Sequence, residues 1–190
     1  MTQLVDPVQR STRTIRIVGW SVLAAIFMGP VIAMRLTADL AWTGLDFALF
    51  GALLIMIGLG CDLVVRHVHS GMVRLAWAMT LGTAAGLTLA NGAVGLMGGE
   101  GAEANALFGL VLGVLVIGTA GARARAGRMA YVLGAAAGTQ LAVVTVILLA
   151  QLEPPLGAAR WDALISGPGF ALLWLMAAYL FQKAAKRPSA

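Results

Sequence analysis

Long uncharged runs separated by short charged segments dominate this chain. Five runs of 18 to 25 residues, each bounded by charged side chains, span 17–34, 75–99, 104–122, 129–152 and 163–182. Each is long enough to cross a hydrocarbon core about 30 Å thick as a helix that rises about 1.5 Å per residue. A sixth run, 47–61, is short by itself, but it reaches about 24 residues when extended to 42–65, a typical spanning length.

The pattern predicts an all-α fold, a polytopic transmembrane bundle of six helices. Strands are excluded because an open strand edge would leave backbone groups unpaired in lipid. We expect a cytoplasmic tail at 1–14, one transmembrane domain at 15–182 and a second cytoplasmic tail at 183–190. The spans are predicted at about 15–35, 43–65, 75–97, 105–122, 129–151 and 163–181.

Composition supports the same class. Hydrophobic residues make up 60% of the chain and charged residues 11%, whereas a soluble domain carries about 25% charged residues. An ordinary soluble enzyme and a nucleic-acid-binding module are therefore excluded, although the net charge is +5. Cys61 is the only cysteine, so neither an intramolecular disulfide nor a thiolate metal cluster is expected.

The basic residues alternate with the predicted spans. If six helices cross the membrane, the two tails and the second and fourth connections hold eleven of the 13 lysines and arginines, and the opposite side keeps only Arg35 and Arg160. Such a bias places both termini in the cytoplasm, and the predicted location is a bacterial inner membrane. Six of the 8 acidic residues fall on the opposite, outer side.

Polar residues from several spans are predicted to meet at the outer membrane surface. This outer-face cluster comprises Arg35, Trp42, Asp46, Asn91, Glu100 and Asn105. Three interpretations stay open: a hydrogen-bonded turn in which Asn105 or Glu100 caps the fourth helix, a ligand or cation site, or a docking surface for another membrane protein. Oxygen donors suit hard cations, but the spacing matches no calcium loop, so no metal is assigned.

Two patches resemble a family of small uncharacterised bacterial membrane proteins with six spans. Members of that family typically read Asn-Gly-Ala-Val-Gly-Ile-Ile-Gly-Ser-Glu-Asp-Asn-Pro-Ala-Asn at one turn, and this chain has Asn-Gly-Ala-Val-Gly at 91–95, followed by Gly98, Glu100 and Asn105. A second patch, at 42–47, shares Trp-Thr and Asp-Phe with the family. The chain departs from the family at 101–103, where Gly-Ala-Glu replaces Asp-Asn-Pro. The resemblance implies a site but no chemistry, because the family has no established activity.

Small residues and one amide predict how the helices associate. Glycine pairs at four-residue spacing occupy the third, fourth and fifth spans, and each pair lies on one helix face, which predicts a tightly packed core of these three helices. The pairs are Gly82 and Gly86, Gly109 and Gly113, and Gly134 and Gly138.

Deep and interfacial polar side chains add further expectations. Gln140, halfway along the fifth span, is expected either to hydrogen bond to Thr80, Thr83 or Thr88 or to form an intramembrane polar site. Asp62 and Arg66 have the i,i+4 spacing of a salt bridge. Trp42, Trp161 and Trp174 include candidates for interfacial anchors.

No catalytic machinery is predicted. The histidines, His67 and His69, point about 200° apart if helical and stand outside the spans, and the chain has no HExxH motif, phosphate loop or Ser–His–Asp arrangement. We expect a non-enzymatic membrane protein without cofactors, a sensor, regulatory or accessory subunit that binds a ligand or partner at the outer-face cluster. The alternative is a small oligomeric carrier for an uncharged or weakly polar solute. Its expected partners are the lipid bilayer and either a second membrane protein or further copies of itself, and no nucleic acid.

Overall fold

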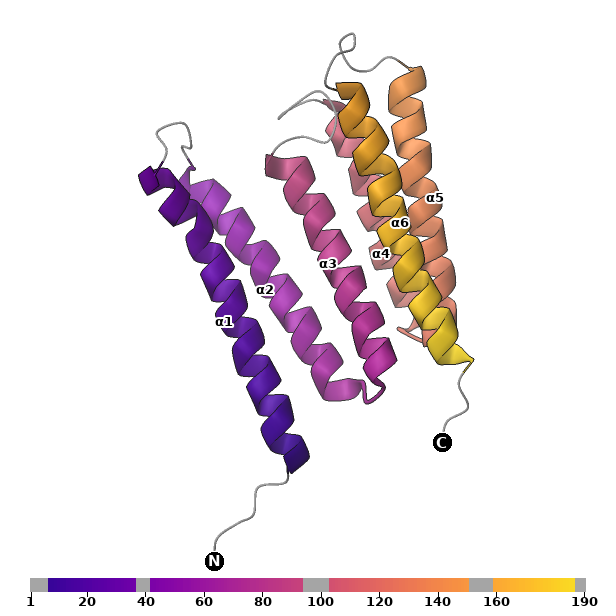
Figure 1. Ribbon diagram of the computed structural model, residues 1–190. Helices are drawn as coiled ribbons and strands as arrows, with labels where there is room; N and C mark the ends of the chain where they lie inside the picture. The colour runs from indigo at the N-terminus through magenta and orange to yellow at the C-terminus, as the bar shows by residue number, and fades with distance from the viewer. Residues whose placement is uncertain (1–6, 37–41, 94–102, 151–158, 187–190) are drawn as a thin grey trace, which may run out of the picture. The chain divides into compact units, whose positions relative to one another are not determined.

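The regular structure of this protein is helical. The computed structural model describes residues 7–36, 42–93, 103–150 and 159–186 (Figure 1). Within them lie six α-helices and one 3₁₀ helix: α1 (Pro7–Leu36), α2 (Gly44–His67), α3 (Gly71–Ala93), η1 (Glu103–Phe108), α4 (Gly109–Ala122), α5 (Ala126–Leu149) and α6 (Ala159–Ala185). The predicted all-α class is confirmed.

The helices follow the predicted spans closely, and they extend beyond them at both ends of the chain. α1 begins at Pro7, inside the expected tail, because proline suits the first position of a helix, where its missing N–H leaves no bond unmade. Five of the described helical segments are long and apolar enough to cross a membrane: Arg13–Leu36, Gly44–His67, Gly71–Gly92, Ala104–Ala122 and Ala126–Leu149. These segments indicate a multi-pass membrane protein.

The helices divide into two compact units. Unit 1 contains α1 and α2 within Met1–His69, and unit 2 contains α3 to α6 within Ser70–Ala190. The division arises because the extensive packing contacts join helices within a unit, with α1 against α2 and α6 against both α3 and α5.

Unit 1 is an antiparallel helix pair in which large side chains of α1 meet glycines of α2. A Cβ atom on Gly58 would lie 2.7 Å from the Trp20 ring and 2.9 Å from Leu23 Cδ1, and one on Gly51 would lie 3.2 Å from the Phe27 ring. Glycine is therefore required at Gly58 for the two helices to approach this closely.

An aromatic cluster closes the end of unit 1 that includes the start of α2. Trp42 meets Phe47 and Phe50 edge to face, with ring centroids 5.4 Å and 5.3 Å apart. Phe27 of α1 stacks on Phe50 at 6.1 Å. Such pairs stabilise beyond simple burial by about 0.5–1.5 kcal/mol each.

Unit 2 is built around α6. Its Trp174 and Phe181 side chains are fully buried, and Phe181 meets Trp77 of α3 edge to face at 5.4 Å. On the α5 side, a Cβ on Gly167 would lie 2.8 Å from Val144, and at the other end of the same contact a Cβ on Gly127 would lie 3.7 Å from Ala185. α5 and α6 are therefore antiparallel and run side by side (Figure 1).

The predicted role of the glycine pairs is wrong. A Cβ on Gly82, Gly109, Gly113, Gly134 or Gly138 would meet nothing within 4 Å, and one on Gly86 would meet only Phe170 of α6, at 3.6 Å. The close approach instead occurs at single glycines, such as Gly118, where a Cβ would lie 2.6 Å from Val132. Four-residue spacing places two glycines on one face, but it does not specify that this face meets another helix.

Candidate functional site

Most of the basic residues of each unit gather at one end, whereas Arg35 and Arg160 lie at the opposite ends of α1 and α6. In unit 1, Asp62 Oδ2 forms a salt bridge with Arg66 Nη2 at 2.7 Å, as the i,i+4 spacing predicted. Asp62 also pairs with Nε of Arg16 on α1. In unit 2, the contact between Gly127 and Ala185 brings the start of α5 next to the end of α6. We call this end of unit 2 its basic end, because the described residues there include Arg123, Arg125, Arg128, Lys183 and Lys186.

Asp46 and Trp42 of the outer-face cluster serve unit 1 itself. Oδ2 of Asp46 accepts hydrogen bonds from the backbone N–H and the hydroxyl of Thr43, both at 2.7 Å, and the Asp46 backbone N–H donates to the Thr43 hydroxyl at 3.3 Å. This is a capping box at the start of α2. Trp42 packs in the aromatic cluster, and Arg35 is exposed, without an ion pair to any carboxylate that the structure describes.

Asn91 and Asn105 come together in unit 2. The Asn91 side-chain amide donates to the backbone carbonyl of Asn105 at 3.0 Å, which ties the end of α3 to η1. Asn91 Oδ1 is buried and has no hydrogen-bond partner in the part of the chain that the structure describes, and the Asn105 side chain is also buried. The predicted cap by Asn105 is wrong, because Phe108 occupies the N-cap of α4 and no side chain caps it. Glu100 lies outside the described residues.

Among the described residues of the outer-face cluster, one pair is therefore shown in contact. Asn91 and Asn105 meet within unit 2, whereas Arg35, Trp42 and Asp46 belong to unit 1. The one carboxylate in this described set, Asp46, is already bonded to its own helix terminus. Its oxygens are thus less available to a ligand than the spacing of the sequence alone suggested.

Gln140 is fully buried in unit 2, and its amide is unsatisfied. Neither Oε1 nor Nε2 has a hydrogen-bond partner among the described atoms. The predicted bonds to α3 are absent among the described residues, and Thr80 and Thr88 donate instead to the carbonyl groups of Ala76 and Ala84 on their own helix, both at 2.8 Å. A buried amide without a partner costs about 1–3 kcal/mol, so this position requires an explanation.

Trp174 is a second unsatisfied polar group in the same core. Its side chain is fully buried and its indole Nε1 has no described partner, so the prediction of an interfacial anchor is wrong for this residue. Counting from the Gly167–Val144 contact, Gln140 and Trp174 lie within about one helical turn of each other along the α5–α6 contact. The position of Trp174 midway along the run 163–182 was the sequence signal for a deep side chain.

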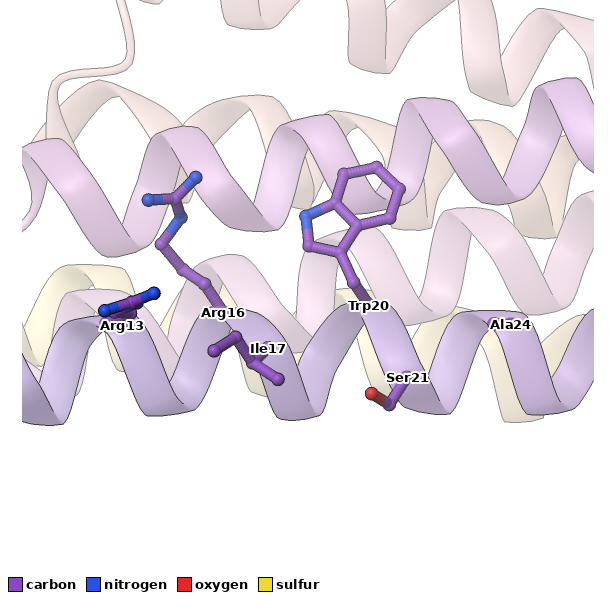
Figure 2. Close-up of a pocket in the computed structure, with 6 residues that line it drawn as sticks. All are labelled: Arg13, Arg16, Ile17, Trp20, Ser21 and Ala24. Carbon is purple, nitrogen blue, oxygen red and sulfur yellow. The ribbon is translucent and has the colours of Figure 1, made fainter.

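A hollow of about 550 Å³ lies on α1 in unit 1 (Figure 2). Figure 2 shows Arg16 and Trp20 extending from α1 towards the neighbouring helix, whereas Ser21 points away. Arg16 is neutralised by Asp62, and most of the exposed lining is apolar. The hollow is therefore mostly apolar, with Arg13 as a second cation in its lining.

The helices and the buried amide define the class as a multi-pass helical membrane protein with polar groups inside one of its packing units. Comparison with protein-family models, with curated proteins and with solved structures finds no match. The resemblance carried by residues 42–47 and 91–105 thus stays a prediction. Among the described residues, no group of three or more His, Cys, Asp or Glu side chains is placed to hold a metal ion.

Proposed function

We propose that this protein is a non-enzymatic carrier that binds a small, uncharged, polar solute at Gln140 and Trp174. The observation that supports this most directly is the fully buried Gln140 amide, whose donor and acceptor atoms both lack a partner among the described residues. An amide offers two donors and one acceptor oxygen, and an indole offers one donor. Together they match the hydroxyl, carbonyl and amino groups of a neutral solute.

The absence of ionisable side chains from three of the apolar runs favours a neutral solute over an ion. The runs 75–99, 104–122 and 129–152 contain no Asp, Glu, Lys, Arg or His. Ionisable side chains inside the membrane commonly mark ion pathways and proton relays. In this chain the deepest polar groups are neutral, so binding relies on hydrogen bonds.

The proposal is tested by substituting Gln140 with leucine. Removing an unsatisfied buried amide while keeping similar volume should raise the free energy of unfolding by about 1–3 kcal/mol, and it should abolish solute movement. Stability is measured by thermal denaturation in detergent. Flux is measured by light scattering of proteoliposomes under glycerol or urea gradients.

Thr145→Val is the matched control on α5, because the Thr145 hydroxyl is exposed and donates to its own helix at Leu141 O, 2.8 Å away. It should change neither quantity. If Gln140→Leu instead lowers stability, the amide is a structural contact. If wild-type protein moves neither glycerol nor urea faster than empty liposomes, the carrier proposal fails for these probes.

A second function is favoured by Asn91, whose buried Oδ1, next to the Asn105 contact, has no partner within the described ranges. We propose as the alternative that this corner binds a partner membrane protein, making the chain a sensor or accessory subunit. If this corner binds a partner, Asn91→Asp should place an unpaired charge in the contact and weaken co-purification of the partner. If the chain is a carrier, Asn91→Leu should affect only its stability. The proposed setting for both functions is a bacterial inner membrane, with six spans and both termini in the cytoplasm.

A further inference from the structure

A groove of about 520 Å³ runs along the surface of unit 2 between α5 and α6. Its floor includes Gly134 and Ala178, and its sides include Tyr131 and Tyr179, which are 82% and 59% exposed. Lys186 lies at one end of its lining. The groove is therefore apolar and aromatic along its length and positively charged at the basic end.

We propose that this groove binds one anionic glycerophospholipid from the leaflet next to the basic end. Along α6 the lining extends from Leu175 to Lys186, which corresponds to about 16 Å of helix. A single leaflet contributes about 15 Å of hydrocarbon, half of the bilayer core. An acyl chain in the groove thus places its headgroup at Lys186 and Gln182.

Charge complementarity selects an anionic headgroup. The segments 104–152 and 163–190 contain no Asp or Glu, so these helices supply no carboxylate side chain to neutralise the lysines and arginines of the basic end. Lys183 lies next to this groove, with Nζ 5.9 Å from the ring centroid of Tyr179. Basic pockets between membrane helices near an anionic surface are recognised sites for phospholipid headgroups.

Glycine at Gly134 keeps the groove open. A Cβ atom there would meet nothing within 4 Å, and the same is true of Gly138 one turn further along α5. Gly134 lines the groove and Gly138 does not. Leucine at the two positions therefore makes a matched pair, in which only the first substitution fills the groove.

The experiment measures binding of palmitoyl-oleoyl phosphatidylglycerol and phosphatidylcholine to the purified full chain in detergent by native mass spectrometry. Wild-type protein should prefer phosphatidylglycerol. Lys186→Gln should weaken its binding about fivefold, the effect of one cation beside an anionic lipid, and leave phosphatidylcholine unchanged. Arg125→Gln, which removes a cation from the same end but outside the groove lining, should weaken phosphatidylglycerol binding less than Lys186→Gln does and should also leave phosphatidylcholine unchanged.

Gly134→Leu should weaken binding of both lipids at least fivefold, whereas Gly138→Leu should not. Glycerol 3-phosphate, which carries the headgroup charge without acyl chains, should not displace the bound lipid. Equal binding of the two lipids by the wild type, or equal effects of the two leucine variants, overturns the proposal. Unchanged lipid binding with a lower oligomeric mass in Gly134→Leu would assign the groove to a second copy of the chain, and would also overturn it.

Discussion

At the scale of single residues, polar side chains near helix ends bond mostly within their own unit. Asp46 closes a capping box with Thr43, and Asn91 ties α3 to η1 through Asn105 O. The capping box satisfies backbone N–H groups that the start of a helix leaves unpaired, and the Asn91 bond joins two helical elements. Gln140 and Trp174 are different, because their buried polar atoms have no such local partner among the described residues.

The capping box at the start of α2 leads to a prediction for Thr43. Thr43→Ala should lower the free energy of unfolding by about 1 kcal/mol, since an N-cap hydroxyl typically contributes about 0.5–2 kcal/mol. Thr43→Ser keeps the hydroxyl and should remain near wild type. Thermal denaturation of the purified protein in detergent measures both, and equal losses for the two variants would contradict the cap.

At the scale of helices, contact depends on the fit between one glycine and one large or branched side chain. Trp20 fits against Gly58, Val132 against Gly118, and Val144 against Gly167. The glycine pairs at four-residue spacing take little part in these contacts. The glycine content therefore indicated that helices pack closely. Which glycines lie at the close contacts depended on how each helix is rotated about its axis.

Two glycines of α4 test this packing directly. Gly118→Ala should destabilise the protein by about 1–3 kcal/mol, because its Cβ would lie 2.6 Å from Val132 Cγ1 and overpacked methyl groups force side chains off their rotamers. Valine is stiff at χ1 and cannot easily rotate away. The measurement is the melting temperature in detergent.

Gly113→Ala is the control on the same helix. Its Cβ would enter open space, so the variant should be neutral or slightly more stable, because alanine has the higher helix propensity. A loss equal to that of Gly118→Ala would show that glycine itself, rather than close approach to Val132, matters in α4.

At the scale of the whole molecule, the charge pattern makes a prediction about topology. In a chain with Cys61 replaced by serine, single cysteines at Thr2 and Ser189 should be labelled by a membrane-impermeant maleimide only after a bacterial host is permeabilised. A cysteine at Glu100 should be labelled in intact cells, because the basic segments stay in the cytoplasm. Labelling of only one terminus in intact cells would mean an odd number of spans.

The fold could be predicted further than the site. Helix positions followed from run length, and α2 and α5 begin and end within about three residues of their predicted spans. Within the predicted cluster only Asn91 and Asn105 are shown in contact. Polar character and depth are properties of a position in the chain, whereas contact between two side chains depends on the rotation and pairing of their helices.

The amino-acid sequence alone determined the helical class, the apolar spans and the charged ends, because hydrocarbon admits little else than a helix whose backbone bonds are satisfied within itself. Tertiary structure decided which helices pair, which glycines allow close approach, and that the buried polar atoms of Gln140 and Trp174 have no partner among the residues described. Apolar faces are nearly equivalent in lipid, so hydrophobicity does not choose among them. Shape complementarity selects the faces that pack together, and it is a property of two helices in contact rather than of either sequence segment alone.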